Sequence, residues 1–309
     1  MEHFYYPSQG RGQLHGCRWL PDGEVRGIVQ IVHGIAEYVE RYDEFARYLN
    51  GLGYLVVAED HMGHGGSVGE SETKGYFHGG WFTAVADTYR LLETTHQAYP
   101  QVPYVLFGHS MGSFMTRTIL EKYPDSGISA CVICGTGWQP QALLAGAIPV
   151  CKWVCKHDGE DQPSPKLEKI VFGTYNARVE SPKTPFDWLN RDEAAVQAYV
   201  DDPMCGFVST AGLLRDMLTG ISYIEKKENL AKMKKHLPIF FIAGGDDPVG
   251  SYGKGVLKTE AEFRKAGMVN VTCKLYPGGR HEILNEINRQ EVYEDVAKWL
   301  DRVLPKKEK

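Results

Sequence analysis

The sequence predicts an α/β fold, with a mostly parallel central sheet, helices on both faces and one long helical insertion. Short apolar runs alternate with helical stretches over the first 134 residues. The alternation stops over residues 138–236 and resumes at Leu237. An apolar run also leads directly into Gly108-His109-Ser110-Met111-Gly112, with a helical stretch after it. Strands that alternate with helices favour a parallel sheet covered on both faces.

Composition limits the classes of protein to consider. A chain of 309 residues, 43% of them hydrophobic, can bury a large core. The net charge of −5 and the absence of a basic stripe exclude nucleic acid as a partner. We expect no signal peptide and no membrane span. Seven cysteines without zinc-type spacing indicate free thiols in a reducing compartment, so we expect a cytoplasmic protein without metal or cofactor and leave its oligomeric state open.

The first half of the chain predicts five strands and three helices. The apolar runs expected to form strands are His3–Tyr6, Gln13–Trp19, Gly27–Val32, Tyr54–Glu59 and Pro103–Phe107. The first two are close enough in sequence to form a hairpin. The stretches expected to form helices are Tyr42–Gly51, Trp81–Tyr99 and Ser113–Tyr123.

The second half predicts three more strands and two more helices outside the insertion. The expected strands are the apolar runs Ile128–Cys134, Leu237–Ala243 and Val271–Tyr276. The expected helices are Val256–Gly267 and the amphipathic Glu291–Leu304. We expect the basic tail, Pro305–Lys309, to be a frayed, solvated end.

Residues 138–236 form the predicted insertion, which divides the core into residues 1–137 and 237–309. A connection of this length needs helices of its own, and we expect it to cap the carboxyl ends of the strands. Its apolar stretch Ala142–Val154 is interrupted only by Lys152. We expect an ordinary buried helix of the cap there. The alternative is that its apolar face lines an acyl-chain pocket or touches lipid.

The five residues around Ser110 have the pattern of a nucleophile elbow, G-x-S-x-G between a strand and a helix. Such a turn strains the serine backbone and leaves its hydroxyl free. Gly108 and Gly112 are needed because the helix passes so close to the strand that a β-carbon would clash. The backbone N–H of Met111 then points at any negative charge that develops beside Ser110.

A serine hydroxyl needs a base, and in this architecture the acid and then the histidine follow the serine along the chain. The strand Leu237–Ala243 is followed by two candidate acids, Asp246 and Asp247. Proline after Asp247 favours an ordered carboxylate there, with Asp246 as a turn residue. After the last strand stands His281, the expected base.

The second oxyanion donor should come from the loop after Gly27–Val32, and we assign the N–H of Ile35 beside that of Met111. His33, in the same loop, precedes the serine, so a structural hydrogen bond is expected of it. The loop Asp60–Ser67, with its two histidines, is expected to be held by side-chain hydrogen bonds and not by a metal. His109 is expected to pack and to form hydrogen bonds.

Together these motifs, with Glu37, Arg41-Tyr42 and Glu282 beside them, resemble the α/β-hydrolase fold. They are most similar to its monoacylglycerol lipase and lysophospholipase branch. The resemblance implies cofactor-free hydrolysis of a small, lipid-like fatty-acyl ester, with Ser110, Asp247 and His281 as the triad. From the apolar stretch of the insertion, a transient membrane-surface contact through the cap is also an expectation. The alternatives are a peptidase of the proline iminopeptidase type, an acyltransferase, or a binding protein without activity; the apolar stretch in the insertion favours acyl chains.

Overall fold

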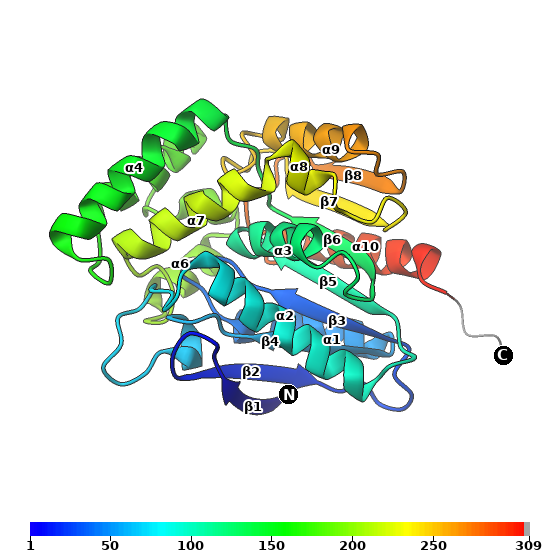
Figure 1. The fold of residues 1–309 in the computed structure, drawn as a ribbon. Helices are drawn as coiled ribbons and strands as arrows, with labels where there is room; N and C mark the ends of the chain where they lie inside the picture. The colour runs from blue at the N-terminus through cyan, green and yellow to red at the C-terminus, as the bar shows by residue number, and fades with distance from the viewer. Residues whose placement is uncertain (306–309) are drawn as a thin grey trace.

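An eight-stranded sheet forms the centre of the protein, and the computed structural model describes it with the rest of residues 1–305 (Figure 1). The strand order is β1-β2-β4-β3-β5-β6-β7-β8. The first three strands in this order pair antiparallel, and all later pairs are parallel. In chain order the strands are β1 (Glu2–Pro7), β2 (Gln13–Trp19), β3 (Gly27–Val32), β4 (Tyr54–Glu59), β5 (Tyr104–His109), β6 (Ile128–Cys134), β7 (Ile239–Gly244) and β8 (Val271–Tyr276).

The predicted strands and the mostly parallel sheet are confirmed, with end points that differ by at most two residues. The apolar runs were informative because β3, β4, β5 and β7 are buried at every position. Parallel strands covered on both faces carry apolar side chains throughout, not in alternation. The expected hairpin is also confirmed, since β1 pairs antiparallel with β2.

Five helices of the core cover the two faces of the sheet. On one face lie α1 (Asp43–Gly51) and α10 (Arg289–Val303), whose apolar side chains share one cluster with the sheet. The other face carries the larger cluster under α2 (Trp81–Ala98), α3 (Met111–Lys122) and α9 (Lys254–Lys265). All five predicted helices are therefore confirmed, again with small shifts at their ends.

Residues between β6 and β7 form the helical insertion that the sequence predicts. Figure 1 shows these helices to one side of the sheet, with α4 outermost. α7 contacts α2 and α3 of the core as well as α4, so it joins the insertion to the sheet. The elements are α4 (Gln141–Asp158), α5 (Pro165–Phe172), the 3₁₀ turns η3 (Tyr175–Arg178) and η4 (Asp187–Leu189), α6 (Glu193–Asp201), α7 (Ala211–Ile224) and α8 (Lys227–Leu230).

The expectation that Ala142–Val154 forms a buried helix is wrong. It forms most of α4, but only Leu144 and Cys151 are buried there, and the Trp153 side chain is 60% exposed. The reason is that α4 packs mainly against α7, along one stripe, so much of its remaining surface faces solvent. Apolar composition identified the helix but not the neighbour that would bury it.

Two further observations concern the ends of the chain and the lipid bilayer. Of the predicted frayed tail, only Pro305 is described, and it is exposed; the rest of that prediction lies outside the described residues. Within residues 1–305 no helix has both the length and the apolar character needed to cross a bilayer.

The contact of α7 with α2 depends on one glycine. A β-carbon at Gly220 would overlap the indole ring of Trp81, which is itself buried. We therefore expect Gly220→Ala to lower the free energy of unfolding by about 1–3 kcal/mol through overpacking. The measurement is urea denaturation followed by tryptophan fluorescence.

Gly146 in α4 is the matched control, because a β-carbon there would meet nothing within 4 Å. Alanine favours the helix over glycine by about 0.5–1 kcal/mol, so Gly146→Ala should be neutral or stabilising. Equal stabilisation by the two substitutions would contradict the packing assigned to Gly220.

Candidate active site

Ser110 occupies the junction between β5 and α3 in a backbone conformation that few non-glycine residues adopt. Its φ is +53° and its ψ is −122°. Such conformations cost about 1–3 kcal/mol and persist only when neighbouring structure imposes them. Here the Ser110 N–H donates to Cys134 O at 3.0 Å, and the Ser113 N–H and hydroxyl both donate to Ser110 O. The predicted strained turn is therefore present.

The two glycines of the turn are required by space, as the sequence predicts. A β-carbon at Gly112 would overlap the backbone carbonyl of Val32 in β3. A β-carbon at Gly108 would overlap Thr116 Oγ1 and the backbone of Gly112 itself. α3 thus lies directly against β3 and β5, with no side chain between their backbones. This close approach is what forces the backbone of Ser110 out of the usual regions.

His281 and Asp247 form a buried hydrogen-bonded pair. His281 Nδ1 lies 2.9 Å from Asp247 Oδ2, and both residues are at most 2% exposed. The other carboxylate oxygen, Asp247 Oδ1, accepts the Val249 N–H at 2.8 Å. Asp246 is exposed, and its backbone N–H donates to Gly279 O. Of the two candidate acids, only Asp247 has a carboxylate that is hydrogen-bonded to the imidazole of His281.

Ser110 and His281 line the same cavity. The His281 ring is held between the ring of Trp188, 5.1 Å away between centroids, and that of His109, 4.8 Å away. Among the described residues no hydrogen bond joins the Ser110 hydroxyl directly to His281. The elements that bring these groups together are the ends of β5, β7 and β8, at the carboxyl edge of the parallel sheet.

The loop after β3 lies beside Ser110. The Ile35 side chain lines the cavity next to Ser110, and Ala36 has a positive φ of 54°. The carbonyl of Ala36 accepts the Tyr199 hydroxyl at 2.9 Å and the Gly206 N–H at 3.0 Å. In residues 1–305 no hydrogen bond uses the backbone N–H of Ile35 or of Met111, so both amides are available to a ligand.

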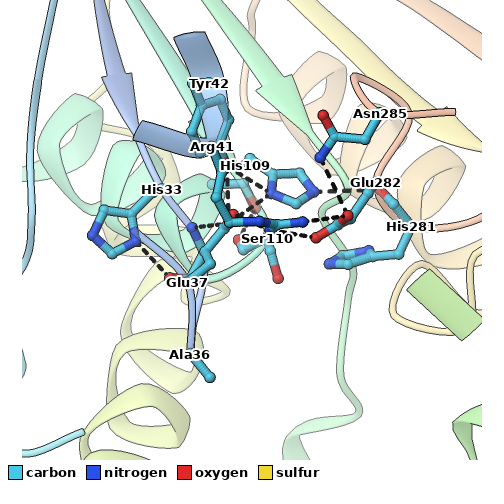
Figure 2. Close-up of polar contacts among 12 residues, drawn as sticks. His33, Ala36, Glu37, Arg41, Tyr42, His109, Ser110, His281, Glu282 and Asn285 are labelled. Atoms are coloured by element: carbon cyan, nitrogen blue, oxygen red, sulfur yellow. Dashed lines mark hydrogen bonds and ion pairs between the residues drawn. The ribbon is translucent and has the colours of Figure 1, made fainter. Parts of the chain in front are cut away.

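A buried network of charged side chains fixes this loop relative to His281 (Figure 2). Arg41 lies between two carboxylates, with Nη1 2.8 Å from Glu37 and both terminal nitrogens on Glu282, at 2.6 and 2.8 Å. Glu37 also accepts the Tyr42 hydroxyl at 2.9 Å and His109 Nδ1 at 3.1 Å. Since Glu282 is the neighbour of the proposed base, the network ties the loop after β3 to the loop after β8.

The network shifts the pKa values of two of its members in opposite directions. Burial alone would raise the pKa of Glu37, but the hydrogen bond and charge of His109 and the charge of Arg41 outweigh it and lower that pKa. Burial alone would lower the pKa of His109, but the hydrogen bond and charge of Glu37 raise it. His109 Nε2 also donates to the carbonyl of His281, at 3.3 Å. His109 is thus a hydrogen-bonding residue, as predicted.

The other histidines near the site are structural. His33 Nδ1 donates to Gly34 O at 2.7 Å, and its Nε2 accepts the His61 N–H at 3.0 Å, which fixes a neutral tautomer. Burial lowers the pKa of His33 and supports that assignment. In the loop Asp60–Ser67, the Asp60 carboxylate accepts the N–H groups of Val39 and Gly66, and the Ser67 hydroxyl donates to Asp60 O. The predicted hydrogen-bonded loop is therefore present.

Two cavities meet at Ser110, and they differ in the side chains that line them. The first, of about 340 Å³, is lined partly by polar side chains of the insertion, among them Glu168, Asn176 and Ser209. The second, of about 200 Å³, is lined almost entirely by apolar groups. These apolar groups include Met111, Phe114, Leu143, Ala147, Ile170, Met217, Leu218 and Ile221.

Sequence reasoning missed the role of several residues that build this site. It noted Glu37, Arg41 and Glu282 beside the motifs but assigned them no partners. It also assigned no role to Trp188, which comes from the insertion and packs against His281. The one available signal was that these charged residues stand in otherwise apolar, glycine-rich loops. Nothing in the sequence indicated which residue of opposite charge would pair with each of them.

The pKa of His109 offers a test of the network. Because the Glu37 charge raises that pKa, the neutral substitution Glu37→Gln should lower it while preserving shape. The stability that protonated His109 contributes is complete below its unfolded pKa of about 6.5 and is lost as pH rises through the higher folded value. The measurement is an NMR titration of the imidazole. An unchanged pKa in Glu37→Gln would show that this charge is not the cause.

Comparison with known proteins agrees with this geometry. The monoacylglycerol lipase of Mycolicibacterium smegmatis is 29% identical over 290 residues, covering 91% of this chain and 90% of that protein. Mouse monoglyceride lipase is 28% identical over 94% of this chain and 87% of its own length. Among solved structures, the carboxyl esterase from Bacillus coagulans in complex with glycerol is 31% identical, covers 98% of both chains and superimposes with a TM-score of 0.91.

The family model described as serine aminopeptidase, S33, matches residues 23–288, from just before β3 to just before α10. That range contains the elbow, the buried acid–histidine pair and the whole insertion. The chain belongs to this family of serine hydrolases and has the α/β-hydrolase fold.

Proposed function

We propose that this carboxylic ester hydrolase cleaves fatty-acyl esters of a small polar alcohol, through a covalent ester on Ser110. The observation that carries the proposal is the meeting of an apolar and a partly polar cavity at Ser110. An ester of this kind has the same division, with an acyl chain on one side of the carbonyl and an alcohol on the other. Relatives named as monoacylglycerol lipases support this substrate class.

The apolar cavity is suited to the acyl chain. Side chains from α3, α4 and α7 form its walls, and burying each methylene of a chain there is worth about 0.8 kcal/mol. Leu143 and Ile170 line it as well, and they are 56% and 70% exposed. The apolar lining therefore continues to the surface of the insertion.

The other cavity is suited to the alcohol. Glu168 and Ser209 offer hydrogen-bonding groups to a hydroxylated head group, and exposed Lys169 also lines the cavity. Glycerol and a phosphate-linked head group both remain candidates within this class.

In the proposed mechanism His281 takes the proton of Ser110 as the hydroxyl attacks the ester carbonyl. Asp247 holds the imidazole in the required tautomer and stabilises its charged form. His281 then protonates the leaving alcohol, and water repeats the cycle on the acyl-enzyme. A hydrogen bond between Ser110 and His281 would form as substrate binds, since such catalytic contacts tighten in the complex.

The N–H groups of Ile35 and Met111 are the proposed oxyanion donors. Each would stabilise the tetrahedral intermediate by about 3 kcal/mol. Arg41, Glu37 and Glu282 would not touch the substrate. Their role would be to fix the position of the loop of Ile35 relative to the loop of His281.

A peptidase of the proline iminopeptidase type is less well supported. Such an enzyme needs a free carboxylate for the substrate amine. Glu37 and Glu282 are both paired with Arg41, and Glu168 already accepts the Ser209 N–H at 3.1 Å. Burial raises the pKa of Glu168, which further weakens it as an anion. The apolar cavity has no evident use in that reaction.

We further propose that residues 138–236 act as a cap over residues 1–137 and 237–309, and that this cap touches lipid surfaces. The support is the set of exposed apolar side chains on α4 and α5, Leu143, Val150, Trp153 and Ile170, of which Leu143 and Ile170 line the apolar cavity. The seven cysteines are unpaired, which supports a reducing compartment such as the cytoplasm.

Ser110→Ala tests the central proposal. Hydrolysis of monoacylglycerols should fall by about 10⁴-fold or more in kcat, and labelling by a fluorophosphonate should disappear. The substrate panel should hold monoacylglycerols and lysophosphatidylcholines of several chain lengths beside aminoacyl amides. Retained turnover in Ser110→Ala would refute the role of Ser110, and faster cleavage of the amides would refute the substrate class.

The two neighbouring aspartates supply a matched pair for the same assay. Asp247→Asn should lower kcat by about 10⁴-fold because the imidazole loses its orienting carboxylate. Asp246→Asn, one residue away and exposed, should leave kcat unchanged.

The size of the apolar cavity predicts chain-length selectivity. Ala147 lines it, whereas Ala145, on the same helix, is exposed outside it. We expect Ala147→Phe to reduce kcat/KM for long acyl chains by about 10-fold or more while short esters are still cleaved, since two lost methylenes already amount to about 1.6 kcal/mol. Ala145→Phe should leave the chain-length profile unchanged. If both variants behave alike, the acyl chain binds elsewhere.

A further inference from the structure

We propose a second site, separate from the hydrolase centre, that binds a divalent transition metal of the Zn²⁺ class. Four side chains supply it: His3, His15, Cys17 and Glu40. One potential ligand atom from each lies within 4.8 Å of the other three. None of the four lines either cavity beside Ser110. The site departs from the sequence-based expectation of a metal-free protein.

Strand pairing places three of the ligands on one face of the β1–β2 hairpin. His3 is the register partner of Cys17, and His15 lies two residues before Cys17 on the same strand. Side chains two residues apart on a strand point to the same face. Glu40 comes from η1 (Val39–Tyr42), in the loop that follows β3. His3 and Glu40 are exposed, and His15 and Cys17 are buried.

The distances between the potential ligand atoms are close to those in a tetrahedral metal site. With metal–nitrogen bonds near 2.05 Å and a metal–sulfur bond near 2.3 Å, ligand atoms should be about 3.4 Å apart for two nitrogens and about 3.6 Å for sulfur and nitrogen. Cys17 Sγ lies 3.6 Å from His3 Nδ1 and 3.9 Å from His15 Nε2. The two ring nitrogens are 2.8 Å apart and would separate by roughly 0.6 Å on binding.

A buried carboxylate orients the inner histidine. His15 Nδ1 lies 2.7 Å from Asp60 Oδ2, and Asp60 is fully buried. With its Nδ1–H donated to Asp60, His15 presents the Nε2 lone pair to the cluster, the arrangement that carboxylates impose on metal-binding histidines. The second Asp60 oxygen accepts the Val39 N–H at 2.8 Å, next to Glu40. One carboxylate therefore positions ligands from both segments.

Metal binding at this site requires two proton movements. The Cys17 thiol proton leaves to solvent as sulfur binds the metal. The His3 ring proton moves from Nδ1 to the solvent-facing Nε2, which frees Nδ1 as a ligand. Two imidazoles, one thiolate and one carboxylate form a donor set that suits Zn²⁺, and four protein ligands make the site structural, without an open position for a substrate.

Such a site would join the edge of the sheet to the loop of the hydrolase centre. β1 is the edge strand, and η1 lies a few residues after Ile35 and directly before α1. A metal would therefore fix the hairpin to the segment that also contains Arg41. It would add a stabilising cross-link without taking part in ester cleavage.

The experiment measures Zn²⁺ and Co²⁺ binding to the full chain, without a polyhistidine tag, after dialysis against a chelator. We expect one Zn²⁺ per chain in competition with a chromophoric chelator. Co²⁺ should give a thiolate-to-metal charge-transfer band that is absent from Cys17→Ser. Because Cys17 is buried and its replacement could unfold the hairpin, the affinity test uses the exposed ligands: His3→Ala and Glu40→Gln should each weaken Zn²⁺ binding at least about 10-fold.

Matched controls are His157→Ala, at an exposed histidine, and Glu2→Gln, at an exposed glutamate beside His3. Both should bind Zn²⁺ like the unmodified protein. The proposal is overturned if no stoichiometric Zn²⁺ binds, if His3→Ala binds as tightly as its control, or if the Co²⁺ complex lacks the thiolate band. Ester hydrolysis by Ser110 is independent of these readouts, so failure here leaves the proposed function intact.

Discussion

The close approach of α3 to β3 and β5 is the constraint on which the rest of this structure depends. Gly108 and Gly112 let the helix lie directly against strand backbone, and the chain can make that contact only by turning sharply at Ser110. The strain at Ser110 is offset by burial around it: every residue of β5 is buried, and so is nearly all of α3. A rigid, apolar scaffold therefore holds one polar side chain at the edge of the sheet, where two cavities open.

The loops around this turn are held together by buried ion pairs. The loops after β3 and β8 carry groups of opposite charge, which would gain little from pairing in water. Buried together, Arg41, Glu37 and Glu282 satisfy one another, and any one of them left alone would be costly. The insertion also contributes hydrogen-bond acceptors. Arg280 of the core donates to two backbone carbonyls of the insertion, those of Asp187 and Asn190, at 2.7 and 2.8 Å. These hydrogen bonds join the insertion to the loop of His281.

The insertion supplies most of the side chains that line the two cavities at Ser110. Its α4 packs by one stripe on α7 and leaves large apolar side chains exposed beside the apolar cavity. A surface of that kind is unfavourable in water, and it is the basis of the lipid contact proposed above. The other cavity, which also has polar side chains in its lining, is formed by α5, the segments after it and the loops of the core around Ser110. Phe172 and Trp188 line both cavities, so the same segments of the insertion shape the two sides of the site.

The strands, the core helices, the elbow at Ser110 and the positions of Asp247 and His281 could be predicted from the sequence, because each depends on local periodicity or on glycine and proline at fixed positions. It favoured Asp247 over Asp246 without showing which carboxylate meets the histidine, and it misjudged the burial of Ala142–Val154. It gave no indication that His3, His15, Cys17 and Glu40 converge. The partner of the histidine, the exposure of α4 and the cluster of four ligands became evident in the tertiary structure alone. Each depends on which distant segment lies opposite, and the residues adjacent in sequence do not identify that segment.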